Sequence, residues 1–135
     1  DAHLKTILGT GNLVSFSNVA RASLVAMMAG ADFIKTSTGK EGINANLPVS
    51  LVMLRAIREF HQRTGTMVGF KPAGGIRAAR DAISYLILMR EELGFPWLNA
   101  HYFRIGASGL LGDISRQLEH YLSGRYSASH RHPMG

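Results

Sequence analysis

Short apolar runs alternate along the chain with longer segments of helical periodicity, and glycines or polar residues separate them. Four runs read as β-strands, at residues 3–8, 32–36, 66–71 and 102–107. They begin near positions 4, 32, 66 and 101, at intervals of 28, 34 and 35 residues. A helical segment follows each of them. This repeated strand–helix unit predicts a parallel sheet.

The helices are expected where apolar positions recur every three or four residues. The first should begin at Ser17 or Asn18 and run to about residue 29, and the second should begin at Asn46 and end at Gly65. The third should span 77–93, and the fourth should end at Gly124. The sides expected to pack on the sheet are Val19, Ala22, Ser23 and Ala26; Val49, Val52, Met53, Ala56, Ile57 and Phe60; Ala79, Ile83, Leu86, Ile87 and Leu93; and Leu110, Leu111, Ile114, Leu118, Tyr121 and Leu122.

Two α/β architectures suit this order of elements: an open doubly wound sheet, or part of an eight-unit barrel. A whole barrel needs roughly 250 residues, so four units would form about half of one. The first strand-to-helix turn, at residues 9–12, has no third glycine in dinucleotide-binding register, which disfavours a nucleotide-binding sheet. In both architectures ligands bind at the carboxyl ends of the strands, where residues 37–40, 72–75 and Ser108 are expected.

Two lysines occupy equivalent places in consecutive expected strands. Side chains alternate along a strand, so Lys35 shares a face with Phe33, and Lys71 shares a face with Gly69. If both lysines point into a barrel, the charge of one lowers the pKa of the other, and burial lowers it as well. Only a neutral amine attacks a carbonyl, so one lysine is a candidate Schiff-base nucleophile that the other tunes. The alternative is a pair of strand-end lysines with their ammonium groups in water.

Glycine-rich turns follow the third and fourth expected strands. Gly74 and Gly75 precede the third helix, and the turn from Gly106 through Ser108 precedes the fourth. Backbone N–H groups in such turns approach an anion closely, and the start of a helix favours negative charge. Each turn alone is most simply a tight turn, but two after consecutive strands match the phosphate site of barrel enzymes.

Composition narrows the classes of protein that remain. The chain of 135 residues is 46% apolar and 18% charged, which is typical of a globular domain or a part of one. Its first residues read like the interior of a longer protein. No secretory pattern opens it, and no apolar run is long enough for a membrane span. The absence of cysteine excludes disulfides and thiolate sites and fits a cytoplasmic protein.

Charge and histidine content bear on the partners. The net charge is +6, from 15 Lys and Arg against 9 Asp and Glu. The basic residues are scattered and do not alternate with aromatic residues, so a phosphorylated metabolite is a better partner than nucleic acid. The histidines at 3, 61, 101, 120, 130 and 132 form no helical pair with a carboxylate. Neither a metal nor a cofactor is expected.

Three segments resemble the deoxyribose-phosphate aldolases, class I aldolases that form a Schiff base inside a TIM barrel. They are residues 30–40 (GADFIKTSTGK), 69–75 (GFKPAGG) and 103–108 (FRIGAS). The resemblance covers nearly the whole chain. The tail is similar to the animal-type branch, and the chain corresponds to the C-terminal half of the family's proteins. It implies a (βα)8 TIM barrel fold of which this chain covers about four βα units, strands five to eight. Residues 1–124 would form this half barrel, and 125–135 a flexible tail.

The resemblance also implies roles for single residues. Lys35 would form the Schiff base, and Lys71 would keep the pKa of its neighbour low. Thr38 and Lys40 would belong to the substrate-facing loop. Gly74, Gly75 and Ser108 would belong to the phosphate site, together with the turn at Gly106. The implied reaction is the reversible cleavage of 2-deoxyribose 5-phosphate to acetaldehyde and glyceraldehyde 3-phosphate, with a proton relay of water, an Asp and the second lysine.

The chain departs from the family pattern in two places. Gly109 stands where the family usually has Ser or Thr. The relay Asp belongs to an earlier strand, and Asp32 does not replace it, because it precedes Lys35 by three residues and should lie at the far end of the strand. We therefore expect the chain to pair with the missing half barrel or with a second copy. The alternative is a non-catalytic phosphate-binding or assembly module.

Overall fold

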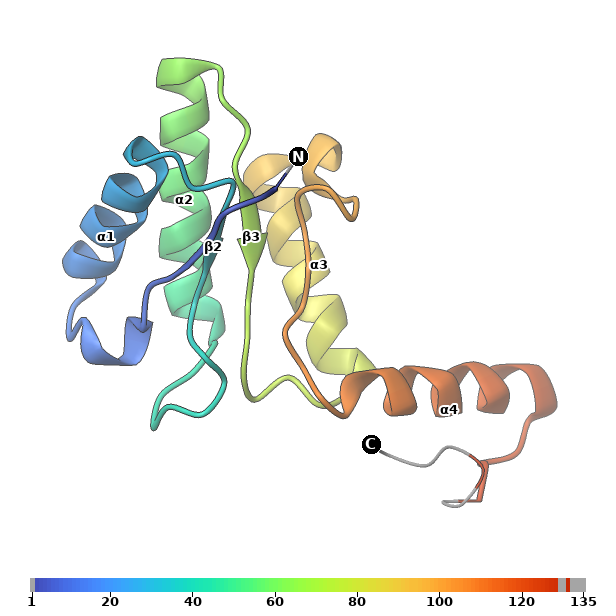
Figure 1. Cartoon of the computed structure of the whole chain (residues 1–135). Coiled ribbons are helices and arrows are strands. Elements are labelled where there is room, and N and C mark those ends of the chain that lie inside the picture. Colours follow the sequence, from blue (N-terminus) through green and yellow to red (C-terminus); the bar gives the residue numbers. More distant parts are fainter. Residues whose placement is uncertain (1, 129–130, 132–135) are drawn as a thin grey trace.

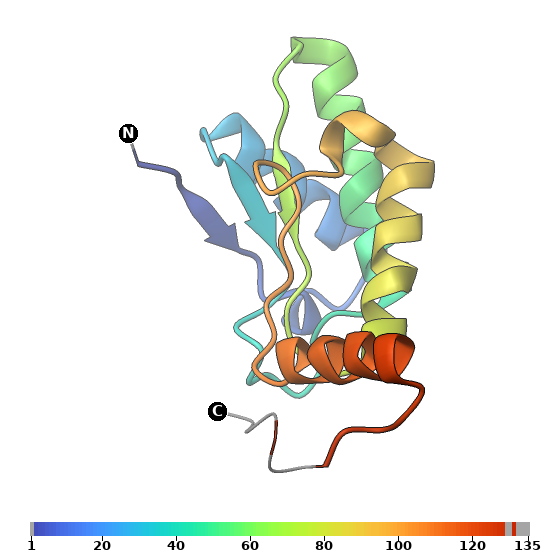
Figure 2. The same cartoon turned by 90° about the vertical axis from the view of Figure 1, so that its right-hand side faces the viewer.

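The computed structural model describes residues 2–128 and 131, in which three parallel strands are covered on one face by helices (Figure 1). The strands are β1 (Lys5–Ile7), β2 (Phe33–Lys35) and β3 (Gly69–Lys71), in the order β1-β2-β3. The helices are α1 (Phe16–Met28), α2 (Leu47–Thr64), α3 (Ala79–Leu93) and α4 (Leu110–Ser123), with 3-10 turns η1 (Thr10–Asn12) and η2 (Phe95–Trp97). Figure 2 shows the strands as one layer and α1 to α3 as the other.

The fourth expected strand is only partly formed. Residues 102–107 lie parallel to β3, but they make two isolated bridges, Phe70 with Phe103 and Ala73 with Gly106. In a parallel ladder Pro72 would donate a hydrogen bond to the carbonyl of Arg104, and proline has no N–H group. The bonds on either side remain, from Arg104 N to Phe70 O and from Gly106 N to Pro72 O. The missing donor therefore divides the strand into two bridges.

The helix boundaries follow local capping. Asn46 caps α2 by accepting a hydrogen bond from Val49 N at 2.9 Å, and Gly65 ends α2 with φ +74°, as predicted. The expected start of α1 was wrong, because the Ser15 hydroxyl rather than Ser17 or Asn18 caps it. The expected start of α3 at residue 77 is also corrected to Ala79. Gly124 ends α4 as predicted.

The predicted apolar sides of α1 and α2 are confirmed. Residues Val19 and Ala26 of α1 and residues Met53 and Ile57 of α2 are buried. They pack with the outward-facing strand residues, such as Ile34, into one core. These two helices therefore fix the outer face of the sheet and leave the alternate strand residues on the opposite face.

The predicted apolar side of α3 was wrong. Ile83 is 54% exposed and Ile87 is 50% exposed, whereas Ala82, Tyr85 and Met89 are buried. The helix carries apolar residues on two sides, and periodicity alone does not determine which of them faces the sheet. The second apolar side of α3 remains uncovered by the part of the chain that the structure describes.

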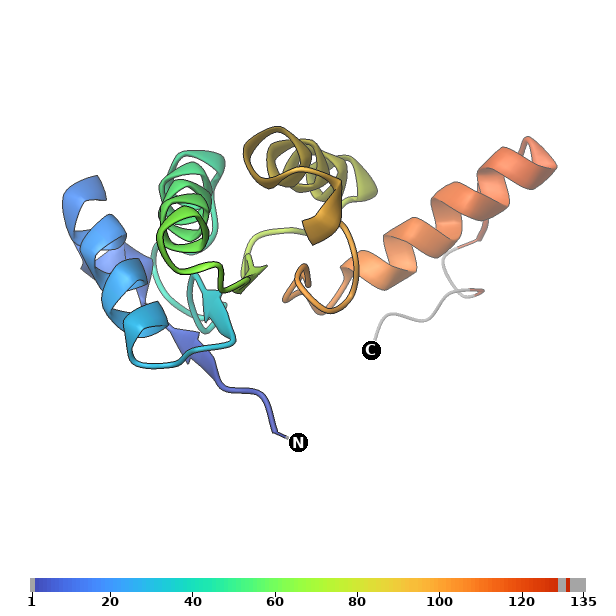
Figure 3. The same ribbon diagram turned by 90° about the horizontal axis from the view of Figure 1, so that it is seen from above.

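The fourth helix points away from the sheet and from the other helices (Figure 3). Of its predicted apolar side, only Leu110 is buried, whereas Leu111 is 74% exposed and Leu122 is 83% exposed. The Asp113 carboxylate attaches the helix by accepting a hydrogen bond from Ala79 N at 2.7 Å. Of the predicted apolar stripe of α4, Leu110 and Ile114 therefore pack on the core, whereas the remainder is exposed. No described helix is both long and apolar enough to cross a membrane.

Candidate active site

The two predicted lysines are neighbours in the sheet. Lys35 on β2 and Lys71 on β3 are Cα partners in the parallel register. Alternation places both on the face opposite the helices, because Ile34 and Phe70 point into the core. Both side chains are half-buried. The structure thus brings together the pair on which the proposed covalent chemistry depends.

Two further cations lie beside the lysine pair. Lys5 on β1 and Arg104 in the segment next to β3 share this inner face, and we call Lys5, Lys35, Lys71 and Arg104 the inner cation cluster. Burial lowers the pKa of Lys71 below its ordinary value of 10.5, and the nearby charges of the other three members lower it further. Burial, then Arg104 and Lys35, also lower the pKa of Lys5. Within residues 2–128 and 131, no carboxylate forms an ion pair with any member of the cluster.

The strand ends that carry the lysines are joined by buried hydroxyl groups. Thr36 Oγ1 accepts a hydrogen bond from Ala73 N at 2.9 Å and donates to Ala73 O at 3.2 Å. Ser37 Oγ lies 2.8 Å from the same carbonyl and 2.8 Å from Asn44 Oδ1. These contacts fix the loop after β2 against the turn after β3.

The loops after the strands enclose a cavity of about 330 Å³. It is lined by six predicted substrate and phosphate residues, namely Thr38, Lys40, Gly74, Gly75, Gly106 and Ser108, and also by Arg77. A Cβ atom on Gly74 would lie 2.6 Å from the Cβ of Asn44, and Gly74 has φ +86°. Glycine is therefore required there on two grounds, and the turn stays close enough to offer its backbone to a ligand. We call this cavity the anion pocket.

Lys71 adjoins the anion pocket at Gly106. A Cβ atom at this position would lie 3.2 Å from Lys71 Cε and 2.7 Å from the Cβ of Ala73. A side chain here would therefore displace the stem of Lys71. Because Gly106 has no side chain, Lys71 can lie directly against the backbone that lines the anion pocket.

The carboxylates near the site have other roles. Asp32 lies at the amino end of β2, as predicted, where its Oδ2 accepts a hydrogen bond from Leu4 N at 2.7 Å. Glu41 Oε1 accepts from Thr38 N at 2.9 Å and orders the loop, whereas its buried Oε2 has no hydrogen-bond partner. Within the described residues no group of three or more metal-ligating side chains occurs, and His130 and His132 lie outside those residues.

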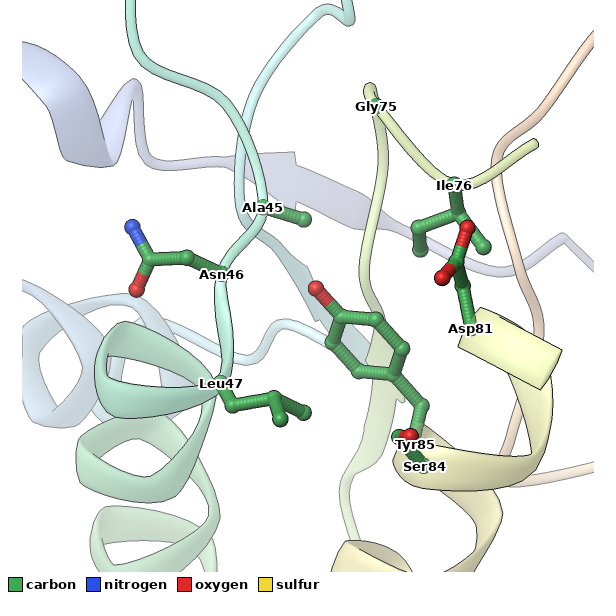
Figure 4. A pocket seen from close by; sticks show the side chains of 8 residues that line it. All are labelled: Ala45, Asn46, Leu47, Gly75, Ile76, Asp81, Ser84 and Tyr85. Carbon is green, nitrogen blue, oxygen red and sulfur yellow. The ribbon is translucent and has the colours of Figure 1, made fainter. Parts of the chain in front are cut away.

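A second cavity, of about 260 Å³, lies behind the anion pocket between the starts of α2 and α3 (Figure 4). Gly75 and Ile76 line both cavities. The buried Tyr85 ring projects into the second one, and burial and the charge of Asp81 raise its pKa, with the Ser50 hydroxyl opposing them. The turn that lines the anion pocket is thus a thin wall between two cavities.

Sequence reasoning missed three residues of the site. Arg77 had been considered only as the start of a helix, although it follows the glycine pair by two positions. Lys5 and Arg104 were also missed, although Lys5 on β1 and Arg104 in the segment beside β3 each have the same parity as their neighbours on the inner face. Alternation of side chains along each strand could have indicated that these residues face inward. Which of them become neighbours depends on the register between the strands.

Comparison with known proteins decides the family. The model of the DeoC/LacD family of aldolases matches residues 6–95, a span that contains both lysines and the turn after β3. The chain belongs to this family. It is 63% identical to the deoxyribose-phosphate aldolase of Mus musculus over 134 residues and 61% identical to that of Homo sapiens, in each case over 99% of this chain. It spans 42% of the length of each of these relatives.

Solved structures agree with this assignment. A Toxoplasma gondii protein, proposed to be a deoxyribose-phosphate aldolase, superposes with a TM-score of 0.75 at 24% identity, covering 95% of this chain and 49% of that one. Its apo form superposes with a TM-score of 0.74 at 27% identity, covering 91% and 47%. The fold is therefore α/β with a parallel sheet, of the kind found in these TIM-barrel-type aldolases.

Proposed function

We propose that this chain carries the Schiff-base half of a deoxyribose-phosphate aldolase. The observation that carries the proposal is the alignment of Lys35 with Lys71 on one sheet face, at the strand ends where the anion pocket opens. A lysine pair in which burial and neighbouring cations lower the pKa of Lys71, next to a phosphate-sized cavity, suits covalent chemistry on a phosphorylated aldehyde. Membership of an aldolase family and the relatives named above favour this substrate over other phosphorylated carbonyl compounds.

In the proposed reaction the neutral Lys35 amine attacks the carbonyl carbon of open-chain 2-deoxyribose 5-phosphate and loses water to form an iminium. The electrons of the broken C–C bond move into an enamine. The hydroxyl of the leaving fragment gives up its proton and becomes a carbonyl, and the fragment departs as glyceraldehyde 3-phosphate. The enamine takes a proton at carbon, and water hydrolyses the imine to release acetaldehyde. Lys71 serves the proton transfers, for which its lowered pKa suits it.

The anion pocket is the proposed phosphate site. Gly74, Gly75 and Gly106 allow backbone N–H groups to approach the phosphate, and Ser108 adds a hydroxyl donor. Lys40 and Arg77 supply positive charge, and an arginine offers two parallel donors to a phosphate. Gly109, directly after Ser108, offers no second hydroxyl, so the pocket depends more on these cations.

The inner face of the sheet, which carries the lysines, requires further polypeptide to cover it. The inner cation cluster has four positive charges and no ion pair within the described residues, so a surface that covers it must bring carboxylates. A second copy would place four like charges opposite the cluster. We therefore propose the other half of a barrel, with inward-facing carboxylates, as the partner, in preference to self-pairing. Size-exclusion chromatography in which the chain remains a 14.7 kDa monomer in the presence of that other half would contradict this proposal.

Three finer assignments stay predictions. They are the numbering of the strands as five to eight of a barrel, the division into a half barrel at 1–124 and a flexible tail at 125–135, and a cytoplasmic location. Fusion of the corresponding N-terminal half of a relative to this chain, followed by assay of cleavage, tests the first of them.

Borohydride trapping tests the proposed chemistry. The chain, alone and with a complementary half barrel, is mixed with acetaldehyde and reduced, and peptide mass spectrometry locates the added two-carbon group. We expect the adduct on Lys35 and its loss in Lys35→Arg, which keeps the charge. Lys40→Arg is the matched control for a lysine outside the strand pair. Equal labelling of all lysines would leave only the phosphate-binding module.

A further inference from the structure

The most unusual contact on the inner face joins an aromatic ring to two cations. Phe33 is 3% exposed, and its ring centroid lies 4.9 Å from Lys5 Nζ and 4.9 Å from Arg104 Cζ. Lys5, Phe33 and Gly69 are successive partners across β1, β2 and β3. Cations at such distances are attracted to the face of an aromatic ring. One ring thus holds two members of the inner cation cluster from opposite edges of the sheet.

The ring can take this place because Gly69 has no side chain. A Cβ atom at Gly69 would lie 2.6 Å from Cζ of Phe33, so the ring rests directly on the backbone of β3. In this position the ring reaches from β2 towards the segment that carries Arg104. The Arg104 side chain is fixed from its other side, because its Nε donates to Ala100 O at 3.0 Å.

We propose that Phe33 is a positioning residue, whose ring holds Lys5 and Arg104 beside Lys71 so that these outer cations, and not Lys35 alone, keep Lys71 ready to give up its proton. This deepens the proposed function and rests on it for the role of Lys71. Among the described residues, the charged groups facing Lys71 are Lys5 from β1, Lys35 from β2 and Arg104 from the adjacent segment. Burial lowers the pKa of Lys71 most, and these charges lower it further in that order. On its other side the sheet packs on the apolar core, as far as the described residues show.

The arrangement has a physical logic. Four like charges on one face repel one another, and exposed lysine and arginine side chains would separate into water. A ring that attracts two of them keeps the charges close without the negative charge of a carboxylate, which would oppose their effect on the pKa of Lys71. The device therefore holds positive charge near a lysine without neutralising it.

The test measures the titration of Lys71 directly, by NMR of 13C-labelled lysine side chains in the full chain without substrate. We expect Arg104→Gln and Lys5→Gln each to raise the titration midpoint of Lys71 by about half a pH unit or more, since each removes a neighbouring cation. Arg80→Gln, which removes the same charge from an exposed site on α3, should leave the midpoint unchanged. Unchanged midpoints in Arg104→Gln and Lys5→Gln would overturn the proposal.

A background experiment separates positioning from burial. Phe33→Leu should raise the midpoint of Lys71 in the natural chain but add nothing in the Lys5→Gln, Arg104→Gln double variant. An equal rise in both backgrounds would show that the ring acts only by excluding water, and would overturn the positioning role. If Phe33→Leu fails to fold, Gly69→Ala takes its place, because its methyl group displaces the ring. Borohydride trapping on Lys35 is scored separately, so a failure here leaves the proposed aldolase chemistry standing.

Discussion

Substitution of Thr36 by valine should destabilise the fold at the point where the two lysine strands end. Thr36 is fully buried, and its Oγ1 accepts a hydrogen bond from Ala73 N at 2.9 Å. Valine has nearly the same shape, so the change removes the hydroxyl without opening a cavity. Within the described residues Ala73 N has no other acceptor.

The magnitude follows from the two groups that lose a partner. A buried N–H without an acceptor costs about 1–3 kcal/mol. The Ala73 carbonyl loses less, because it keeps Ser37 Oγ at 2.8 Å and Ala45 N at 3.1 Å. We expect a loss of about 2 kcal/mol in the free energy of unfolding. For a chain of this size that corresponds to a fall of roughly 6–10 °C in Tm.

Thermal and urea unfolding followed by far-UV circular dichroism measure this loss. Thr36→Ser keeps the hydroxyl and should recover most of the stability. Thr66→Val makes the same chemical change at an exposed site whose hydroxyl has no hydrogen bond among the described residues. If Thr36→Val unfolds within about 0.5 kcal/mol of the natural chain, or Thr66→Val loses as much, the inference from the buried hydrogen bond is refuted.

Three further predictions concern the turn, a helix cap and the cations. Gly74→Ala should cost at least about 1 kcal/mol more than Gly75→Ala in urea unfolding, because both have positive φ but only Gly74 meets a neighbour; equal costs would contradict this. Asn46→Ala should cost about 1 kcal/mol through the lost cap of α2, whereas the exposed Asn12→Ala should cost little, and similar losses would argue against the cap. Because Lys5 and Lys71 have lowered pKa values, the folded chain binds fewer protons than the unfolded one just below pH 10.5, so the free energy of unfolding should rise with pH up to 10.5. Lys5→Met should flatten that rise, and an unchanged slope would count against the lowered values.

The elements that were predicted well are those whose signals are local. Asn46 and Gly65 bound α2 by capping, which depends on a few adjacent residues. The pairing of Lys35 with Lys71 followed from two strands that carry a lysine at the same place relative to the turn that follows. The grouping of the predicted loop residues around one cavity followed similarly, since the carboxyl ends of parallel strands meet at one edge.

The features that were missed depend on tertiary context. The covered side of α3 is chosen by its neighbours, so Ile83 and Ile87 were placed on the wrong side. The break in the fourth strand comes from Pro72, which lies outside that strand and acts on it through a missing donor. The inner cation cluster unites three strands and a loop segment, and only their register shows that Lys5 and Arg104 share a face with the lysine pair.

The hydrogen bond that joins α4 to the start of α3 has a consequence for the proposed ligand binding. The Asp113 carboxylate accepts a hydrogen bond from the first N–H of α3, two residues after Arg77 in the wall of the anion pocket. In the proposed assembly, polypeptide packed on the exposed side of α4 would act on the same turn of backbone as a phosphate bound in the pocket. Thermodynamic linkage makes that influence reciprocal: whatever factor assembly contributes to phosphate affinity, phosphate contributes equally to assembly.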